Sequence, residues 1–260
     1  MTTRDVWDPG RYERFQFERS LPFFDLLALV CPVPGLRIVD LGCGTGALTR
    51  RLHDQLRPLE TVGVDCSAAM LKQCEPHVTD GLSFRVGDLG ALDLEGRFDL
   101  VFSNAALHWV EDHPALLRRL VPLLNPGGQL AVQVPANHEH PSQTLAATVA
   151  SRPTFAEALE GYVRHAPVLS ATRYAEELHE LGFAEQSVAS RVYVHELPDR
   201  EAMVEWVRGT TLTDYERRMP ADLYEKFLEE YRIEVARVFP EATPFFFPFQ
   251  RTLLWGQLDG

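Results

Sequence analysis

The chain has 260 residues, of which 45% are hydrophobic and 24% charged, a composition typical of folded globular proteins and unlike that of disordered ones. Its 25 Lys and Arg residues are outnumbered by 37 Asp and Glu residues, which gives a net charge of -12. This charge argues against a nucleic-acid-binding protein, because such proteins usually carry a basic surface.

Two further patterns concern the compartment. No apolar stretch approaches the roughly 18 residues of a membrane span, and the charged first residues are unlike a secretion signal. The four cysteines form no C-x-x-C pair and no spacing typical of a zinc site or a disulfide framework. We therefore expect a cytoplasmic protein that binds neither metal, nucleic acid nor membrane; the oligomeric state is not predicted.

Short apolar runs alternate with helical patterns through the first half of the chain. Helical patterns cover 47–56 and 114–124, and Ser67 is a candidate N-cap for another helix. The alternation predicts a parallel sheet, with the polar-apolar strand at 82–88 at its edge. The runs typical of strands are 36–41, 61–65, 82–88, 98–103 and 129–134.

The second half is less regular, with helical patterns at 174–181, 200–208 and 221–238 and strands at 187–196 and 250–255. The long segment between these two strands is typical of an insertion. We expect a single domain over 1–260, with cap segments that cover the carboxyl ends of the strands, where open α/β folds bind ligands. Its core is expected at about 31–136, 171–198 and 249–260, and its cap at about 1–30, 137–170 and 199–248.

The segment Asp40-Leu-Gly42-Cys-Gly44-Thr-Gly46 lies between an apolar strand and a helix. Its glycines permit a sharp turn and the close approach of a ligand. Dinucleotide-binding folds use the different spacing G-x-G-x-x-G, and Asp40 would repel a pyrophosphate but attract the ammonium and sulfonium of S-adenosylmethionine. The segment resembles that of the class I methyltransferases, which implies that the glycines pack against the methionine portion and that Asp40 orients its amino group.

Acidic residues also follow the second and third strands. Asp65 is suited to accept hydrogen bonds from both ribose hydroxyls, although an NAD-binding protein would carry an acid there too. The resemblance implies that Asp88 accepts from the adenine amine and that the Leu89 backbone donates to the ring; Asp88 is otherwise a helix N-cap. Met70 is either a core residue or the apolar residue that this family packs against adenine.

The fourth strand is followed by Asn104-Ala-Ala-Leu-His108-Trp109. Asn104 caps the next helix, lines the site, or does both. His108 would be the base for a hydroxyl or amine acceptor, whereas a carboxylate acceptor is already ionised and needs none, so that His108 would then only position it. A core role for His108 stays open, and Trp109 is expected in packing or in the pocket wall.

Two other motifs are weak. The cluster Asn137-His-Glu-His140 contains metal-ligating residue types, but its spacing differs from H-E-x-x-H, and a solvated loop is the favoured interpretation. No G-x-S-x-G elbow of a nucleophilic hydrolase is present.

A closer resemblance, to the trans-aconitate methyltransferase group, spans nearly the whole chain. It includes Trp7-Asp-Pro9, the segment 104–109, Leu130 to Pro135, Tyr193-Val-His195 and Phe247-Pro-Phe-Gln-Arg251. One difference is that Gly209-Thr-Thr-Leu212 leads into Thr213-Asp214, where members of the group often have Arg-Pro.

The closer resemblance implies roles for residues outside the glycine segment. Tyr12 and Phe15 would shield the sulfonium, with Arg19 near the cofactor carboxylate. Guanidinium groups pair well with carboxylates. Arg191, Arg208 and Arg251 are therefore candidates to bind the substrate carboxylates. The other candidates to bind the substrate are His108, Trp109 and Asn137.

We therefore expect a Rossmann-like α/β fold, a seven-stranded, mostly parallel sheet with the last strand antiparallel, as the class I resemblance implies, and a mainly helical cap. The expected reaction is methyl transfer from S-adenosylmethionine to a carboxylate oxygen of a small polycarboxylic acid, giving a monomethyl ester. The alternatives are another small or acyl-carrier-bound acceptor, or a cofactor-binding protein without transferase activity. An NAD-dependent oxidoreductase is disfavoured by Asp40 and the short glycine spacing.

Overall fold

The computed structural model describes the backbone of residues 16–260 and the side chains of residues 20–260. These residues form two compact units. The sheet unit comprises Gln16–Pro135, Pro167–Arg191 and Gln250–Gly260, and the helical unit comprises Ala136–Ala166 and Val192–Phe249.

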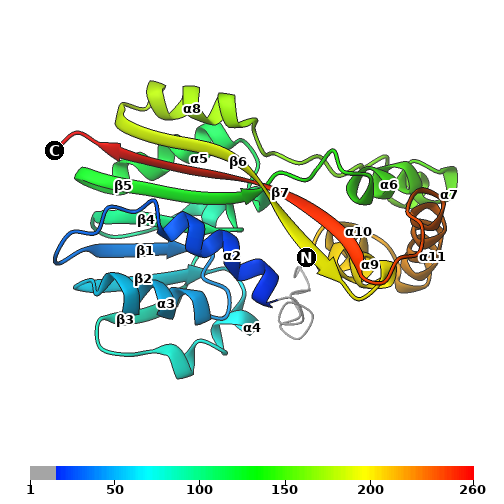
Figure 1. Ribbon diagram of the computed structural model, residues 1–260, viewed down its shortest axis with the longest axis horizontal. Helices are drawn as coiled ribbons and strands as arrows, with labels where there is room; N and C mark the ends of the chain where they lie inside the picture. The colour runs from blue at the N-terminus through cyan, green and yellow to red at the C-terminus, as the bar shows by residue number, and fades with distance from the viewer. Residues whose placement is uncertain (1–15) are drawn as a thin grey trace. The chain divides into compact units, whose positions relative to one another are not determined.

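The sheet has seven strands in the order β3-β2-β1-β4-β5-β7-β6 (Figure 1). The pairs β1 to β2, β1 to β4, β2 to β3 and β4 to β5 are parallel, whereas β7 runs antiparallel to β5. The order confirms the seven-stranded, mostly parallel sheet and places β3 at its edge, as predicted. The strands are β1 (Arg37–Leu41), β2 (Glu60–Asp65), β3 (Leu82–Val86), β4 (Phe98–Asn104), β5 (Leu124–Pro135), β6 (Phe183–Leu197) and β7 (Phe245–Leu258).

Helices cover both faces of this sheet (Figure 1). On one face lie α2 (Gln16–Leu27) and α3 (Ala47–Leu56); the Phe23 ring of α2 contacts Phe102 of β4 at a centroid distance of 5.4 Å. The other face packs against α5 (His113–Leu120) and α8 (Ala171–Glu180), whose apolar side chains share one core with β1, β4 and β5. Burial on both faces explains why the central strands are almost continuously apolar.

Short helical segments connect the strands, and α4, η2 and η3 follow β2, β3 and β4, respectively. The N-cap predicted at Ser67 is confirmed, since its Oγ accepts from the Met70 backbone N–H at 3.2 Å. The segments are α4 (Ala68–Leu71), η1 (Glu75–His77), η2 (Leu89–Ala91), η3 (Leu107–Trp109) and η4 (Val121–Leu123).

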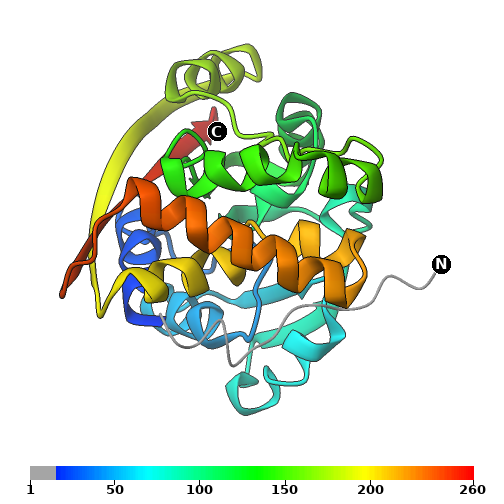
Figure 2. The same ribbon diagram turned by 90° about the vertical axis from the view of Figure 1, so that its right-hand side faces the viewer.

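The helical unit packs around its own apolar core of aromatic and aliphatic side chains. Figure 2 shows α11 lying alongside α6, and the Tyr231 hydroxyl of α11 donates to the Ser142 carbonyl at 2.7 Å. The helices are α6 (Pro141–Ala150), α7 (Pro153–Ala158), α9 (Arg200–Arg208), α10 (Thr213–Arg218) and α11 (Ala221–Val238). Within residues 16–260, no helix has both the length and the apolar character needed to cross a membrane.

The structure corrects one helix boundary and several strand lengths. The helix predicted to reach residue 124 ends at Leu120, and β5 begins at Leu124, because Leu124 pairs with Phe98 of β4 and the Asn125 amide donates to Asp99 at 2.7 Å. Strand pairing thus overrides the turn signal of the Asn-Pro-Gly-Gly segment. The strands predicted at 187–196 and 250–255 extend further, as β6 and β7.

Candidate functional site

The glycine segment forms the turn from β1 into α3, and its three glycines have positive φ angles of 83°, 57° and 79°. A Cβ on Gly42 would lie 2.0 Å from the Ala106 Cβ, and one on Gly46 would lie 2.8 Å from the Phe84 ring. A Cβ on Gly44 would meet nothing within 4 Å. Gly42 and Gly46 are therefore required for packing, whereas Gly44 presents bare backbone to open space, as a ligand cradle requires.

Asp65, the last residue of β2, is fixed by backbone groups on both sides. The Gly44 N–H donates to its Oδ2 at 2.9 Å, and the Ser67 N–H donates to its Oδ1 at 2.8 Å. The N–H groups of Gly42 and Cys43 also donate to the Val64 carbonyl. Each carboxylate oxygen can accept more than one hydrogen bond, which makes Asp65 a suitable acceptor for a pair of hydroxyls.

Asp40 lies beneath the same loop and is only 4% exposed. Its Oδ2 accepts a 2.6 Å hydrogen bond from the Thr49 hydroxyl of α3. The pKa of Asp40 is raised to about 7, mainly by burial and also by the negative charge of Asp65, while the Thr49 bond acts in the opposite direction. A carboxyl group with a near-neutral pKa is one that a neighbouring cation will ionise, which fits the ammonium group of S-adenosylmethionine.

The third strand end holds the residues predicted at the adenine. Asp88 accepts from the Gly90 N–H at 2.7 Å and so caps η2, which leaves its other oxygen without a partner among residues 16–260. Leu89 is 9% exposed, and its Cδ1 would lie 4.0 Å from a Cβ on Gly42. Met70 in α4 is buried. The helix N-cap was one of the two roles predicted for Asp88. Its second oxygen is available for the other predicted role, which is to accept from the adenine amine.

The fourth strand ends in Asn104, which is paired in register with Gln133 of β5. The predicted capping role for Asn104 is wrong, since η3 has Ala106 at its N-cap position and no side-chain cap. Its Oδ1 is buried with no partner among the described residues. His108 and Trp109 follow in η3, with ring centroids 4.8 Å apart. Of the two predicted roles of Asn104, lining the site stays a prediction.

The three candidate arginines differ in their surroundings. Arg191 forms an ion pair with Asp25 of α2 at 2.8 Å. Arg208 of α9 lies 3.5 Å from Glu205. Arg251 is 4% exposed and donates to the Gln133 Oε1 at 3.3 Å.

The remaining predicted residues lie in several parts of the chain. Asn137 is a buried residue of the helical unit. Tyr12 and Phe15 lie outside the described residues, as does the side chain of Arg19. The structure thus brings together the residues of the sheet unit, namely Asp40, Gly42, Gly44, Gly46, Asp65, Met70, Asp88, Leu89 and Asn104, and it places His108 and Trp109 in the turn that follows β4.

Sequence reasoning missed two polar residues, Thr49 and Gln133. Both are fully buried, and a buried polar side chain requires a partner. A threonine in the first turn after the glycine segment was the available signal for Thr49. Nothing in the sequence indicated the contact between Gln133 and Arg251, which are 118 positions apart.

The unusual acid Asp214 is paired inside the helical unit. Arg164 donates to its Oδ2 at 2.8 Å, and the two side chains are 13% and 21% exposed, respectively. A carboxylate neutralised in this way repels an anionic acceptor far less than a free one.

His140 has a structural role. Its Nδ1 accepts from the Ser142 N–H at the start of α6, and its ring stacks on Phe239 at 5.6 Å. In the part of the chain that the structure describes, no three His, Cys, Asp or Glu residues are placed to hold a metal ion.

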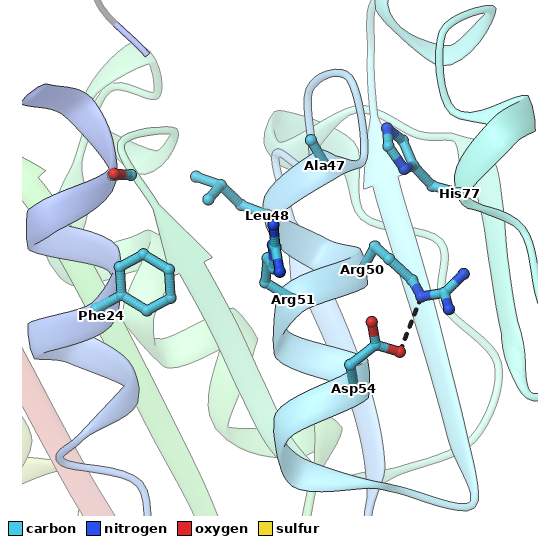
Figure 3. Close-up of a pocket in the computed structure, with 8 residues that line it drawn as sticks. Phe24, Ala47, Leu48, Arg50, Arg51, Asp54 and His77 are labelled. Atoms are coloured by element: carbon cyan, nitrogen blue, oxygen red, sulfur yellow. Dashed lines mark hydrogen bonds and ion pairs between the residues drawn. The ribbon is translucent and has the colours of Figure 1, made fainter. Parts of the chain in front are cut away.

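A separate groove of about 600 Å³ lies over the outer side of α3 (Figure 3). It contains none of the strand-end acids, and its Arg50 is held by Asp54 at 2.8 Å. It is therefore distinct from the candidate cofactor site. The residues that line it are Ser20, Phe24, Ala47, Leu48, Arg50, Arg51, Asp54 and His77.

Comparison with known proteins finds similar methyltransferases. The Methyltransferase domain family matches residues 38–128. A trans-aconitate 2-methyltransferase of Deinococcus radiodurans is 41% identical over 254 residues, which cover 95% of this chain and 96% of that protein. One from Variovorax paradoxus is 37% identical over 239 residues, 91% of this chain and 92% of that protein.

The fold has a counterpart among solved structures. An S-adenosylmethionine-dependent methyltransferase from Mesorhizobium loti aligns with a TM-score of 0.51 at 22% identity, over 93% of this chain and 99% of that one. At this identity the likeness concerns the fold.

Proposed function

We propose that this chain, which belongs to the trans-aconitate 2-methyltransferase family of class I methyltransferases, transfers a methyl group from S-adenosylmethionine to one carboxylate of trans-aconitate. The chain is an S-adenosylmethionine-dependent methyltransferase. The products would be a monomethyl ester and S-adenosylhomocysteine. The observation that carries the proposal is the open backbone at Gly44, flanked by Asp40 and Asp65 at the carboxyl edge of the sheet.

The proposed cofactor site uses an acid from the end of each of β1, β2 and β3, together with neighbouring residues. Asp40 receives the ammonium group, Gly44 lets the methionine portion approach the backbone, and Asp65 accepts from the ribose hydroxyls. Asp88 and the Leu89 backbone bind the adenine edge, and Met70 packs against the adenine. In this proposal the glycines at 42 and 46 keep the turn tight.

The transfer to a carboxylate needs no general base. When bound, S-adenosylmethionine supplies an electrophilic methyl group on its sulfonium. A carboxylate acceptor is ionised near neutral pH, so the residues around it need only hold it in line. Such positioning lowers the activation barrier by up to about 7–11 kcal/mol in well-oriented intramolecular reactions. Asn104, with its buried unpartnered Oδ1, and His108 are the proposed positioning groups at this point.

Recognition of the acid is assigned to cationic and aromatic side chains. Arg191, Arg208 and Arg251 are proposed to pair with substrate carboxylates, because guanidinium and carboxylate groups match as bidentate partners. Trp109 and Asn137 are also proposed to bind the acid. The pairing of Asp214 with Arg164 supports an anionic acceptor in spite of the acid at this position.

The N-terminal residues complete the proposed cofactor pocket. Tyr12 and Phe15 are proposed to shield the sulfonium and Arg19 to bind the cofactor carboxylate. The proposed location is the cytoplasm, and the four cysteines are free thiols in the structure, as suits a reducing compartment.

The test is a reaction of purified protein with trans-aconitate and methyl-labelled S-adenosylmethionine, analysed by mass spectrometry. We expect a labelled monomethyl ester and an equal amount of S-adenosylhomocysteine. A parallel series with other small carboxylic acids, hydroxylated metabolites and acyl-carrier thioesters identifies a different acceptor. Bound cofactor with no labelled product from trans-aconitate would refute the proposed substrate.

A further inference from the structure

Thr49 lies in the first turn of α3 and has no solvent exposure. Its hydroxyl donates to the Asp40 Oδ2 at 2.6 Å, a short distance that is typical of a charge-assisted O–H to carboxylate bond. A buried hydroxyl in this contact serves Asp40 and nothing else that the structure describes. The contact therefore joins the strand that precedes the glycine segment to the helix that follows it.

This bond determines how Asp40 faces a ligand. The two residues are nine positions apart, and all three glycines lie between them, so the bond closes the base of the loop. It also occupies one of the two carboxylate oxygens. The remaining oxygen, Oδ1, has no partner among residues 16–260 and is the one left to accept from a ligand.

We propose that Thr49 is a positioning residue that orients Asp40 and keeps it ionised for the ammonium group of the cofactor's methionine portion. This inference rests on the proposed role of Asp40 in the cofactor site. Thr49 itself does not touch the cofactor; it acts through the carboxylate.

The surroundings of Asp40 explain why it needs such a donor. Among residues 20–260, the ionisable groups that face it are Asp65 of β2, Cys43 of the glycine loop and Cys74 beyond α4, and none of these three is a cation. Burial and the charge of Asp65 both favour the protonated form, and the Thr49 bond is the contact that favours the ionised one. Without it, Asp40 would be largely neutral near pH 7 and would attract an ammonium group weakly.

Two substitutions separate this role from simple packing. Thr49→Val keeps the shape of the side chain but removes the donor, and Thr49→Ser keeps the donor but loses a methyl group. S-adenosylhomocysteine carries the amino acid portion, whereas 5′-methylthioadenosine lacks it. Binding of both compounds to the wild-type protein and both variants is measured by isothermal titration calorimetry from pH 5.5 to 9.

The expected effect of Thr49→Val depends on pH. A tenfold rise in the proton affinity of Asp40, equivalent to about 1.4 kcal/mol, leaves about one-eleventh of it ionised at pH 7 instead of about half. S-adenosylhomocysteine should then bind about fivefold more weakly at pH 7. The ratio of wild-type to variant affinity should rise toward tenfold below pH 6 and approach one by pH 9. This ratio cancels the titration of the ligand's own amino group.

Thr49→Ser should follow the wild-type curve within about twofold, and 5′-methylthioadenosine should bind all three proteins alike. Unchanged binding in Thr49→Val would overturn the proposal, and so would a loss that is the same at every pH, because a packing defect has no titration. Asp40→Asn tests the underlying site separately. If Asp40→Asn binds S-adenosylhomocysteine like the wild type, the assignment of Asp40 itself fails, whatever the protein methylates.

Discussion

Replacing Gly44 with alanine tests whether the open backbone above the glycine loop is where the cofactor lies. Gly44 has a φ of 57°, and a Cβ there would meet no atom of the described residues within 4 Å. The matched control is Gly35, in the loop before β1, which has a φ of 76° and equally open surroundings. Both substitutions place a methyl group on a left-handed backbone, but only Gly44 is proposed to touch the ligand.

The magnitudes follow from this geometry. A left-handed alanine costs about 1–2 kcal/mol, and each kcal/mol lowers the melting temperature by about 2–4 °C in a chain of this size. Both variants should therefore melt about 2–8 °C lower than the wild type. In Gly44→Ala the added methyl group also occupies space that the ligand needs, and overpacking of a close contact costs about 1–3 kcal/mol. The affinity for S-adenosylhomocysteine should fall by about 5- to 150-fold.

The assay combines thermal melting by circular dichroism with calorimetric titration of S-adenosylhomocysteine. We expect equal thermal losses in the two variants and a loss of affinity in Gly44→Ala alone. If Gly44→Ala binds S-adenosylhomocysteine as tightly as Gly35→Ala does, the space above Gly44 is not the cofactor site.

Gly42→Ala should be destabilised by about 3–5 kcal/mol in urea unfolding, more than Gly44→Ala, because its Cβ would lie 2.0 Å from the Ala106 Cβ; equal stability of the two variants would contradict this packing. His113 is buried, and burial lowers its pKa to about 4. About 3 kcal/mol of the free energy of unfolding, present above pH 6.5, should therefore be lost as the pH falls from 6.5 to 4. His113→Gln should flatten that decline in pH-dependent melting, and an unchanged decline would assign it to other groups. His108→Ala should lower kcat at pH 7 by less than about 100-fold in the ester assay, since it removes a positioning contact from an acceptor that needs no base, whereas a loss of about 100-fold or more would indicate a base-requiring acceptor.

The sheet unit was largely predictable because its signals are local. The apolar runs and the glycine segment predicted β1, β2 and β4 and the turn into α3; in the helical unit, α9 and α11 also have the predicted bounds. Local chemistry also identified Ser67 as an N-cap. In each case, neighbours within a few positions determine the backbone conformation.

Features that depend on distant residues were not predictable. The start of β5 at Leu124 depends on pairing with Phe98 of β4, a partner that no local pattern reveals. The Arg164 to Asp214 ion pair joins residues 50 positions apart, so the sequence showed an acid without its counter-ion. The pKa of Asp40 likewise depends on burial and on Asp65, which only the folded chain supplies.

The charges of the strand ends constrain how an anionic acceptor is held. Asp40, Asp65 and Asp88 suit a cationic cofactor, but the same carboxylates repel a polycarboxylic acid. The positive charge that holds the acceptor must therefore come from cations on other elements. The 25 basic residues are all arginines except for Lys72 and Lys226. A guanidinium group stays charged when buried and matches a carboxylate with two parallel hydrogen bonds. A methyltransferase with acidic residues at its cofactor site therefore needs cationic groups, such as these arginines, to hold a carboxylate acceptor.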